Sequence, residues 1–287
     1  MAVALAELVP SLPVGRGWRY EIKVDGHRTV LWRLADSVRL QARSGRDVTA
    51  VWGDLAVSGL ELPPGVVLDG EAVVVVGDRI SFGAAQSRAA SRPARARELA
   101  ERYPALFIVW DLLAGPGGVD LRGRPYVERR GAMLDVLAGL PSGSPVQAVS
   151  ATDDVEVARA WYASLHDIGV EGVVAKLATS TYRAGRSSAW RKARHAETVD
   201  AVVVGFTGPP LRPRTLAVRL PDGRTALSQR LSAPLAAEVG AHLVASPVSG
   251  RGRTDAGEAF TVTGPGVVVE VLAGTTRHAV VTVTRLR

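Results

Sequence analysis

The sequence of 287 residues contains no cysteine, and that absence excludes several kinds of protein. Disulfide-stapled folds, thiolate zinc sites, iron–sulfur clusters and cysteine nucleophiles all need the missing residue. Aromatic residues make up only 5% of the chain, so a core has to be built mainly from valine, leucine and alanine. No apolar run reaches the roughly 18 residues that span a bilayer, and Glu7 and Pro10 interrupt the N-terminal stretch. We therefore expect a soluble, cytoplasmic protein with no membrane partner.

Asparagine is also absent, and lysine is nearly so. Lys23, Lys176 and Lys192 are the only lysines among 35 basic residues. This usage is typical of GC-rich coding, which replaces lysine with arginine wherever arginine serves. A surviving lysine is then a candidate for a task that needs loss of a proton, because arginine stays protonated in proteins. Chance survival of three lysines is the alternative.

The charge balance and the length bound the class of protein. The net charge of +7 and the isoelectric point near 10.3 suit a polyanionic partner such as nucleic acid, although a solvated basic surface explains them equally well. An apolar fraction of 47% and a charged fraction of 22% are typical of globular proteins. The length predicts about two domains.

The pattern of predicted elements changes near residue 197. Before it, strand-like and helix-like segments alternate. The strands are expected at 18–23, 29–34, 38–42, 66–68, 72–76, 106–113 and 173–175, and the helices at 126–137 and 154–167. After it, about five strands and one helix, 234–245, suit a small β-barrel such as the OB fold. The chain is therefore expected to be α+β, with domains at 1–195 and 196–287.

Lys23 stands at the end of an alternating strand. The Asp25-Gly26 turn that follows brings Arg28 back beside it. An unperturbed lysine is almost wholly protonated at pH 7, so a nucleophilic lysine needs burial, a neighbouring cation or a bound metal. Arg28 is such a neighbour. The alternative is an ordinary hairpin with a surface lysine.

Carboxylates and further cations stand at the ends of other strands. Asp69 and Glu71 end a buried strand, and Glu171 begins another; carboxylates so placed suit Mg²⁺. Lys192 and Arg194 are two residues apart on a strand, so they share a face and could grip a phosphate. A nucleophilic amine, metal-binding carboxylates and a phosphate clamp together describe attack on a nucleotide α-phosphate.

The ordered set of motifs resembles the ATP-dependent DNA ligases, within the superfamily of covalent nucleotidyltransferases. The segment from Lys23 to Arg28 matches K-x-D-G-x-R, and Asp69-Gly70-Glu71 matches D-G-E. The other matches are to S-R-x-G, to an aromatic strand, to E-G-x-V-x-K and to K-x-K, at Ala42–Gly45, Phe107–Leu113, Glu171–Lys176 and Lys192–Arg194. The resemblance implies a minimal two-domain bacterial ligase: an antiparallel-sheet, ATP-grasp-like nucleotidyltransferase domain over 1–195, an OB-fold β-barrel over 196–287, and a hinge near 193–198.

The resemblance also implies a role for each motif residue. Lys23 would form the lysyl–AMP bond, Phe107 would stack on adenine, and the backbone near Glu21 and Ile22 would read the adenine edge. Phosphate, ribose and metal contacts would come from Arg28, Glu71, Glu171, Lys192 and Arg194, with Glu71 and Glu171 placing Mg²⁺ or Mn²⁺. Arg43 would hold the nick 5′-phosphate, and Arg28 and Arg43 would both contact DNA. For Lys176, a phosphate contact and a structural salt bridge are both open.

Two positions depart from the family pattern. Arg194 stands where lysine is usual, which keeps the charge and changes the geometry. The family ends its OB domain with R-x-D-K; here Arg277-His278 begins the matching segment and Arg285 matches the arginine, but Arg287 replaces the aspartate. The resemblance therefore implies slow self-adenylylation, with joining of pre-adenylylated DNA retained.

The function implied is an ATP-dependent DNA ligase that seals nicks in duplex DNA through lysyl–AMP and DNA–adenylate, in DNA repair. Nicked duplex DNA is the expected partner, with bacterial end-joining factors as further candidates, and the protein is expected to be a nucleoid-associated monomer. RNA ligase and capping-type nucleotidyltransferase are alternatives. A nucleic-acid-binding module with a lapsed active site is another, which the three lysines at motif positions argue against.

Overall fold

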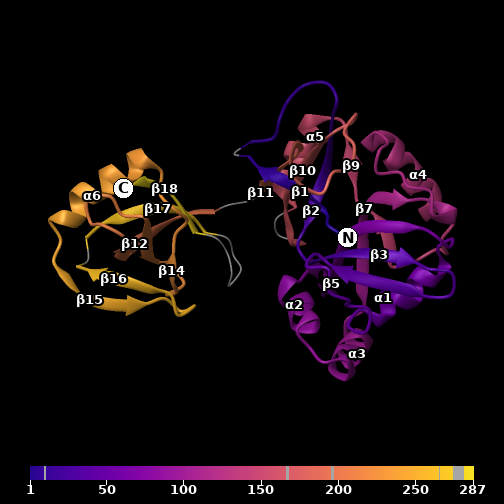
Figure 1. Cartoon of the computed structure of the whole chain (residues 1–287), viewed down its shortest axis with the longest axis horizontal. Helices are drawn as coiled ribbons and strands as arrows, with labels where there is room; N and C mark the ends of the chain where they lie inside the picture. The colour runs from indigo at the N-terminus through magenta and orange to yellow at the C-terminus, as the bar shows by residue number, and fades with distance from the viewer. Residues whose placement is uncertain (10, 166–167, 195–196, 265, 274–280) are drawn as a thin grey trace. The chain divides into compact units, whose positions relative to one another are not determined.

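The computed structural model describes residues 1–9, 11–165, 168–194, 197–264, 266–273 and 281–287. The chain divides into two compact units, Met1–His195 and Ala196–Arg287 (Figure 1). Among the described residues, no helix has the length and apolar character to cross a membrane.

The first unit contains two sheets. One has the strand order β1-β11-β10-β2-β9, formed by β1 (Ala4–Leu8), β11 (Gly185–Arg194), β10 (Val170–Leu177), β2 (Trp18–Val24) and β9 (Ala151–Thr152). The other has the order β4-β3-β5-β7-β8, with β6 beside β5; its strands are β4 (Val38–Ala42), β3 (His27–Arg33), β5 (Val67–Val76), β6 (Arg79–Ile80), β7 (Ala105–Ala114) and β8 (Val146–Ala148). Most neighbours are antiparallel, but β1 pairs with β11 and β7 pairs with β8 in parallel. The sheets are therefore mixed, and the expectation of purely antiparallel sheets was too narrow.

Three apolar clusters order this unit in layers. Val30 and Leu113 from one sheet meet Ala4 and Trp190 from the other, so the two sheets pack face to face. The outer face of the β3–β5–β7 sheet buries a second cluster under α1 (Gly53–Ser58), α2 (Phe82–Ala89) and α4 (Tyr126–Ala138). The outer face of the other sheet buries a third under α5 (Val155–Ser164). Polar residues from both sheets, among them Glu21, Lys23, Arg28 and Glu71, line a pocket between the two sheets.

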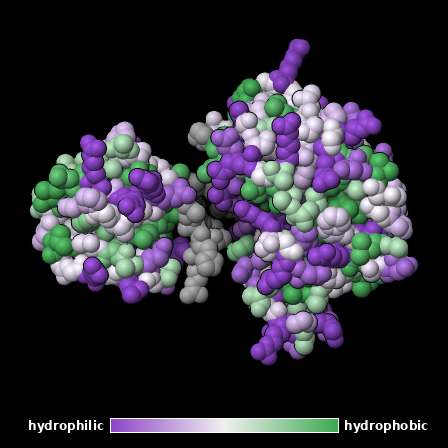
Figure 2. Space-filling model, viewed as in Figure 1, coloured by the Kyte–Doolittle hydropathy of each residue, from purple (hydrophilic) through white to green (hydrophobic). Residues whose placement is uncertain are grey.

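The remaining helices of this unit are peripheral. They are α3 (Pro93–Arg102) and the 3-10 turns η1 (Gly59–Glu61) and η2 (Pro116–Gly118). Helix α3 buries only Ala96, and Figure 2 shows hydrophilic side chains gathered where Figure 1 places it. This helix is a solvated charged element.

The second unit is one antiparallel sheet and one helix. Its strands are β12 (Glu197–Thr207), β13 (Thr215–Arg219), β14 (Thr225–Leu227), β15 (Val248–Arg253), β16 (Ala259–Thr263), β17 (Val268–Ala273) and β18 (Val281–Leu286). Helix α6 (Ala233–Val244) packs against β18, and Val239 and Leu243 enter an apolar core with Val203 and Val269. Within the described ranges, a single bridge between Ser228 and Val281 links the two ends of the sheet. The described pairings therefore form an antiparallel sheet with one parallel bridge, and they do not close the barrel that the sequence predicted.

Candidate active site

A pocket of about 220 Å³ lies between the two sheets of the first unit. Both sheets and the turn after β4 contribute to its wall. The wall includes these residues that the sequence singled out: Glu21, Ile22, Lys23, Arg28, Arg43, Glu71, Lys176 and Lys192. Segments far apart in the chain therefore converge on one cavity.

The alternation of β2 aims its polar residues into the pocket. Trp18 and Tyr20 pack on the opposite face, in the cluster under α5, so Glu21 and Lys23 face the other sheet. Strand register extends this face across β10 and β11, because Lys23 lies opposite Gly172 and Gly172 lies opposite Arg194. The nucleophile candidate and Arg194 therefore belong to one row of the sheet.

Glu171 reaches the same row through a β-bulge. The register between β10 and β2 jumps from Val170 to Gly172, so Glu171 is the extra residue, and a bulge re-aims its side chain. Gly172 allows this because its φ is +154° and an added Cβ would lie 2.1 Å from the Ala193 carbonyl oxygen. Glu171 forms ion pairs with Lys23 and, at 2.7 Å, with Arg194. Although burial opposes it, these cations hold the pKa of Glu171 below its ordinary value.

Arg28 is held by an ion pair in the facing sheet. Its guanidinium donates to both carboxylate oxygens of Asp69, at 3.0 and 2.6 Å, and to the carbonyl oxygen of Ala4 at 2.6 Å. Tyr182 donates to the same carboxylate at 2.7 Å, and Asp69 is fully buried. Asp69 is thus an anchor for Arg28 and not the metal ligand that its place at a strand end suggested. The nucleotide and DNA contacts expected of Arg28 stay predictions.

Two carboxyl groups near Lys23 have raised pKa values. Burial raises the pKa of Glu71 to about 7, against the lowering effect of Lys23 and Arg28. Burial and then the charge of Glu171 raise the pKa of Asp25 to about 6. Ionised carboxylates in such a place favour a cation. The described residues contain no group of three or more histidine, cysteine, aspartate or glutamate side chains that could hold a metal ion.

The raised pKa of Glu71 predicts a pH-dependent stability. The folded protein binds a proton that the unfolded chain has released between pH 4.5 and about 7, so the free energy of unfolding of the metal-free protein should fall as pH rises through that range. Glu71→Gln removes this contribution and should make the protein more stable at pH 8, by about 1–3 kcal/mol. Urea denaturation in a chelator at pH 5 and pH 8 measures it, with exposed Glu128→Gln as the control. Equal pH dependence in wild type and Glu71→Gln would contradict the prediction.

The structure overturns the role predicted for Phe107. This residue is fully buried in the cluster under the helices, and its ring lies 2.9 Å from where a Cβ on Gly70 would stand. The ring therefore packs on the backbone of the D-G-E segment and does not line the pocket. Trp110 does line it. Trp110 lies three positions after Phe107, so strand alternation sends the two rings to opposite faces of β7. Alternation alone does not say which of the two faces meets the pocket.

The exchange of roles between Phe107 and Trp110 gives paired predictions. Trp110→Ala should weaken ATP binding by about 10- to 100-fold, because base stacking on an aromatic ring contributes about 1–3 kcal/mol. Phe107→Ala should lower the free energy of unfolding by about 3–5 kcal/mol and leave the ATP affinity of the folded protein unchanged. Calorimetric titration and urea denaturation separate the two effects. Loss of ATP affinity in folded Phe107→Ala alone would restore the original assignment.

The remaining predicted cations are placed differently from one another. Lys192 lines the pocket, and burial followed by the charges of Arg194 and Lys23 lowers its pKa to about 8. Arg43 is exposed on the turn after β4. Lys176 is 1% exposed and forms an ion pair of 2.7 Å with Glu21. Of the two roles open for Lys176, the salt bridge is therefore the one that the structure contains.

The C-terminal motif and the hinge are only partly described. Arg277 and His278 lie outside the described residues, as do residues 195 and 196 of the expected hinge. Arg285 and Arg287 pair with Glu270 at 2.8 and 2.6 Å, and Arg287 also pairs with Asp200. These arginines are held within the second unit, and slow self-adenylylation stays a prediction.

Known proteins resemble this chain over the same region. A family model described as "ATP dependent DNA ligase domain" matches residues 5–194. DNA ligase C of Mycobacterium tuberculosis is 36% identical over 205 residues, which cover 70% of this chain and 56% of that protein. The multifunctional non-homologous end joining protein LigD of Pseudomonas aeruginosa is 34% identical over 213 residues, 73% of this chain and 24% of that protein. The chain thus spans about half, or less, of the length of these curated relatives.

Solved structures resemble the whole chain. A mycobacterial DNA ligase D complexed with ATP and MES superposes with a TM-score of 0.56 at 25% identity, covering 100% of this chain and 94% of that one. A Lig E DNA ligase with a minimal DNA-binding scaffold gives 0.63 at 17% identity, covering 100% and 99%, and supports the fold alone. With the family model covering most of the first unit and the motifs meeting in one pocket, the chain belongs to the ATP-dependent DNA ligase family.

Proposed function

We propose that this protein is an ATP-dependent DNA ligase that seals nicks in duplex DNA. One observation carries the proposal: Lys23, the residue at the nucleophile position of the family, lies in a pocket with Glu71 and Lys192, and is ion-paired to Glu171. Membership of the ATP-dependent DNA ligase family indicates that these residues carry out nucleotidyl transfer. The first unit is proposed as the adenylation domain and the second as the OB-fold domain.

Lys23 would attack the α-phosphorus of ATP with its amine and release pyrophosphate. Glu171 is the hydrogen-bond partner of the Lys23 ammonium and orients it. The proton would leave to solvent, because the neighbouring cations keep Glu171 ionised. Lys192 and Arg194 would neutralise charge that develops on the α-phosphate. AMP would then pass to the 5′-phosphate of the nick near Arg43, and the 3′-hydroxyl would displace it.

Glu71 and Glu171 would hold Mg²⁺ or Mn²⁺ beside the phosphates. Of the two residues, Glu71 is the better supported as a metal ligand. Burial raises its pKa to about 7, so a neighbouring cation would stabilise its ionised form. The bound ion would supply positive charge at the α-phosphate.

Nicked duplex DNA is the proposed substrate, and the net charge of +7 supports it. Binding should weaken steeply as salt rises. Relatives in Bacillus subtilis and Pseudomonas aeruginosa bear the name of non-homologous end joining proteins, which supports a repair role beside end-joining factors. We propose a monomer in the bacterial cytoplasm, associated with the nucleoid.

Sealing of a labelled nicked duplex with ATP and Mg²⁺ tests the proposal. The expected product is a full-length strand, formed from a DNA nick faster than from an RNA nick and not with GTP. Preference for an RNA nick would move the assignment to RNA ligase, and transfer from GTP alone would move it to capping chemistry. Duplex binding without sealing, by protein first treated with pyrophosphate to remove AMP, would indicate a lapsed active site.

A further inference from the structure

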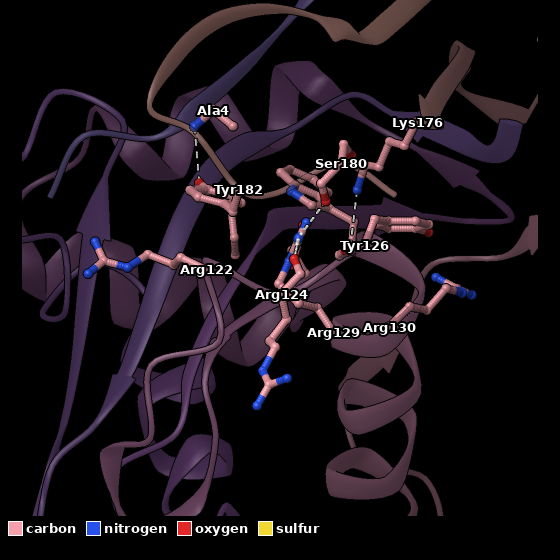
Figure 3. Close-up of polar contacts among 12 residues, drawn as sticks. Ala4, Arg122, Arg124, Tyr126, Arg129, Arg130, Lys176, Ser180 and Tyr182 are labelled. Carbon is pink, nitrogen blue, oxygen red and sulfur yellow. Dashed lines mark hydrogen bonds and ion pairs between the residues drawn. The ribbon is translucent and has the colours of Figure 1, made fainter. Parts of the chain in front are cut away.

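Lys176 is a buried cation that touches two walls of the pocket. Its Nζ lies 2.7 Å from Glu21 Oε2 and donates to the carbonyl oxygen of Trp110 at 3.1 Å. The ring centre of Trp190 lies 4.1 Å from the ammonium, and that of Tyr126 lies 4.9 Å from it (Figure 3). An ammonium has three donors, and one carboxylate, one carbonyl and two ring faces already surround this one, so no donor is left for a phosphate.

Glu21 is held as firmly as Lys176. Its second oxygen, Oε1, accepts from the Tyr126 hydroxyl at 2.5 Å, and Arg130 Nη1 lies 3.6 Å from it. The side chain is 3% exposed, yet the residue lines the pocket. A carboxylate has about four acceptor sites, so acceptor capacity remains after these contacts. Lys176 and Tyr126 therefore fix a hydrogen-bond acceptor, the Glu21 carboxylate, at the wall of the cavity.

The geometry also separates Lys176 from the reacting phosphate. Glu171, the partner of Lys23, lies five positions earlier on β10, and a strand rises about 3.3 Å per residue. The backbones of the two residues are thus about 16 Å apart, but the Lys176 ammonium reaches back to Glu21, which is two positions, or about 7 Å, from Lys23 on β2. Glu171 belongs to the phosphate end of the pocket, and Lys176 belongs to the end that Trp110 and Glu21 line.

We propose that Lys176 is a positioning residue that sets the base specificity of the nucleotide pocket. It fixes the Glu21 carboxylate relative to the Trp110 ring, so that a base stacked on Trp110 presents its 6-position to an acceptor. Adenine carries an amino donor there and guanine a carbonyl acceptor, so the arrangement favours ATP over GTP. The inference rests on the proposed function, because it needs ATP to bind in this pocket.

Formation of the labelled protein–nucleotide adduct from ATP and from GTP tests the role. In Lys176→Met, kcat/KM for ATP should fall at least 10-fold through KM, with kcat within about 3-fold of wild type. The preference for ATP over GTP should fall at least 10-fold. Tyr126→Phe removes one hydrogen bond to Glu21 and leaves the ion pair, so it should show the same change of preference to a smaller extent, about 3-fold, and keeps the test open if Lys176→Met does not fold.

Lys192→Met is the matched control, because it makes the same chemical change at the phosphate end. It should slow reaction with both nucleotides equally and leave their ratio unchanged. An unchanged ATP-to-GTP preference in Lys176→Met and in Tyr126→Phe would overturn the inference, as would a loss in kcat alone. Absence of any adduct in wild-type protein cleared of AMP would instead overturn the proposed function, so the two failures are distinguishable.

Discussion

Lys23→Arg should abolish formation of the protein–AMP adduct, with a loss of at least about 10³-fold in the rate of sealing. Arginine keeps the positive charge that pairs with Glu171, but it retains its proton and cannot attack phosphorus. The fold and the ion pair should survive, so the loss would be one of chemistry. Single-turnover adenylylation with labelled ATP measures it.

The control for Lys23→Arg is Lys192→Arg, the same substitution within the same pocket. A phosphate contact tolerates arginine, so this variant should keep measurable adenylylation. Pre-adenylylated nicked DNA provides a second control, since Lys23→Arg should seal it. Normal adenylylation by Lys23→Arg would show that another group is the nucleophile.

Asp111→Asn should destabilise the first unit by about 3–5 kcal/mol. Arg129 and Asp111 are both fully buried and bind in two parallel contacts of 2.7 and 2.8 Å. The same guanidinium donates to the carbonyl oxygens of Arg124 and Ser180, at 2.6 and 2.9 Å, and so ties α4 to the loop after β10 (Figure 3). Loss of the carboxylate charge leaves the guanidinium buried without a counter-charge.

Urea denaturation followed by tryptophan fluorescence measures the effect of Asp111→Asn. All six tryptophans precede residue 195, so the signal reports on the first unit. Asp120→Asn is the matched control, because Asp120 also pairs with an arginine, at 2.7 Å, but with both side chains about half exposed. It should cost less than about 1 kcal/mol. A similar cost for the two variants would contradict the account of the buried pair.

The sequence could place Lys23, the proposed nucleophile, because local alternation and strand pairing decide the direction of its side chain. The period of β2 sends Glu21 and Lys23 to one face, and that inference needs no distant contact. Residues whose direction depends on a bulge could not be placed. The bulge in β10 turned Glu171 toward Lys23. Phe107 and Trp110 point to opposite faces of β7 by alternation, but only the packing of the helices and of the second sheet decides which face meets the pocket.

Long-range partners were also beyond the sequence. The sequence placed Asp69 at the end of a strand, where a metal ligand is common. Its hydrogen bonds with Arg28 and Tyr182, which come from other elements, identify it as a structural anchor. The partners of Lys176 come from β2 and β7, and Tyr126 from α4 joins them through Glu21. These partners occupy the Lys176 ammonium, so that it is not free to bind a phosphate. A single sequence does not show such contacts.

Peptide mapping of the adduct tests the central claim most directly. Protein cleared of AMP with pyrophosphate would be incubated with α-labelled ATP and Mg²⁺, denatured, digested and analysed by mass spectrometry. The account predicts AMP bonded to Lys23 alone. AMP on Lys192 or Lys176, or a protein that takes no label from ATP, would contradict it.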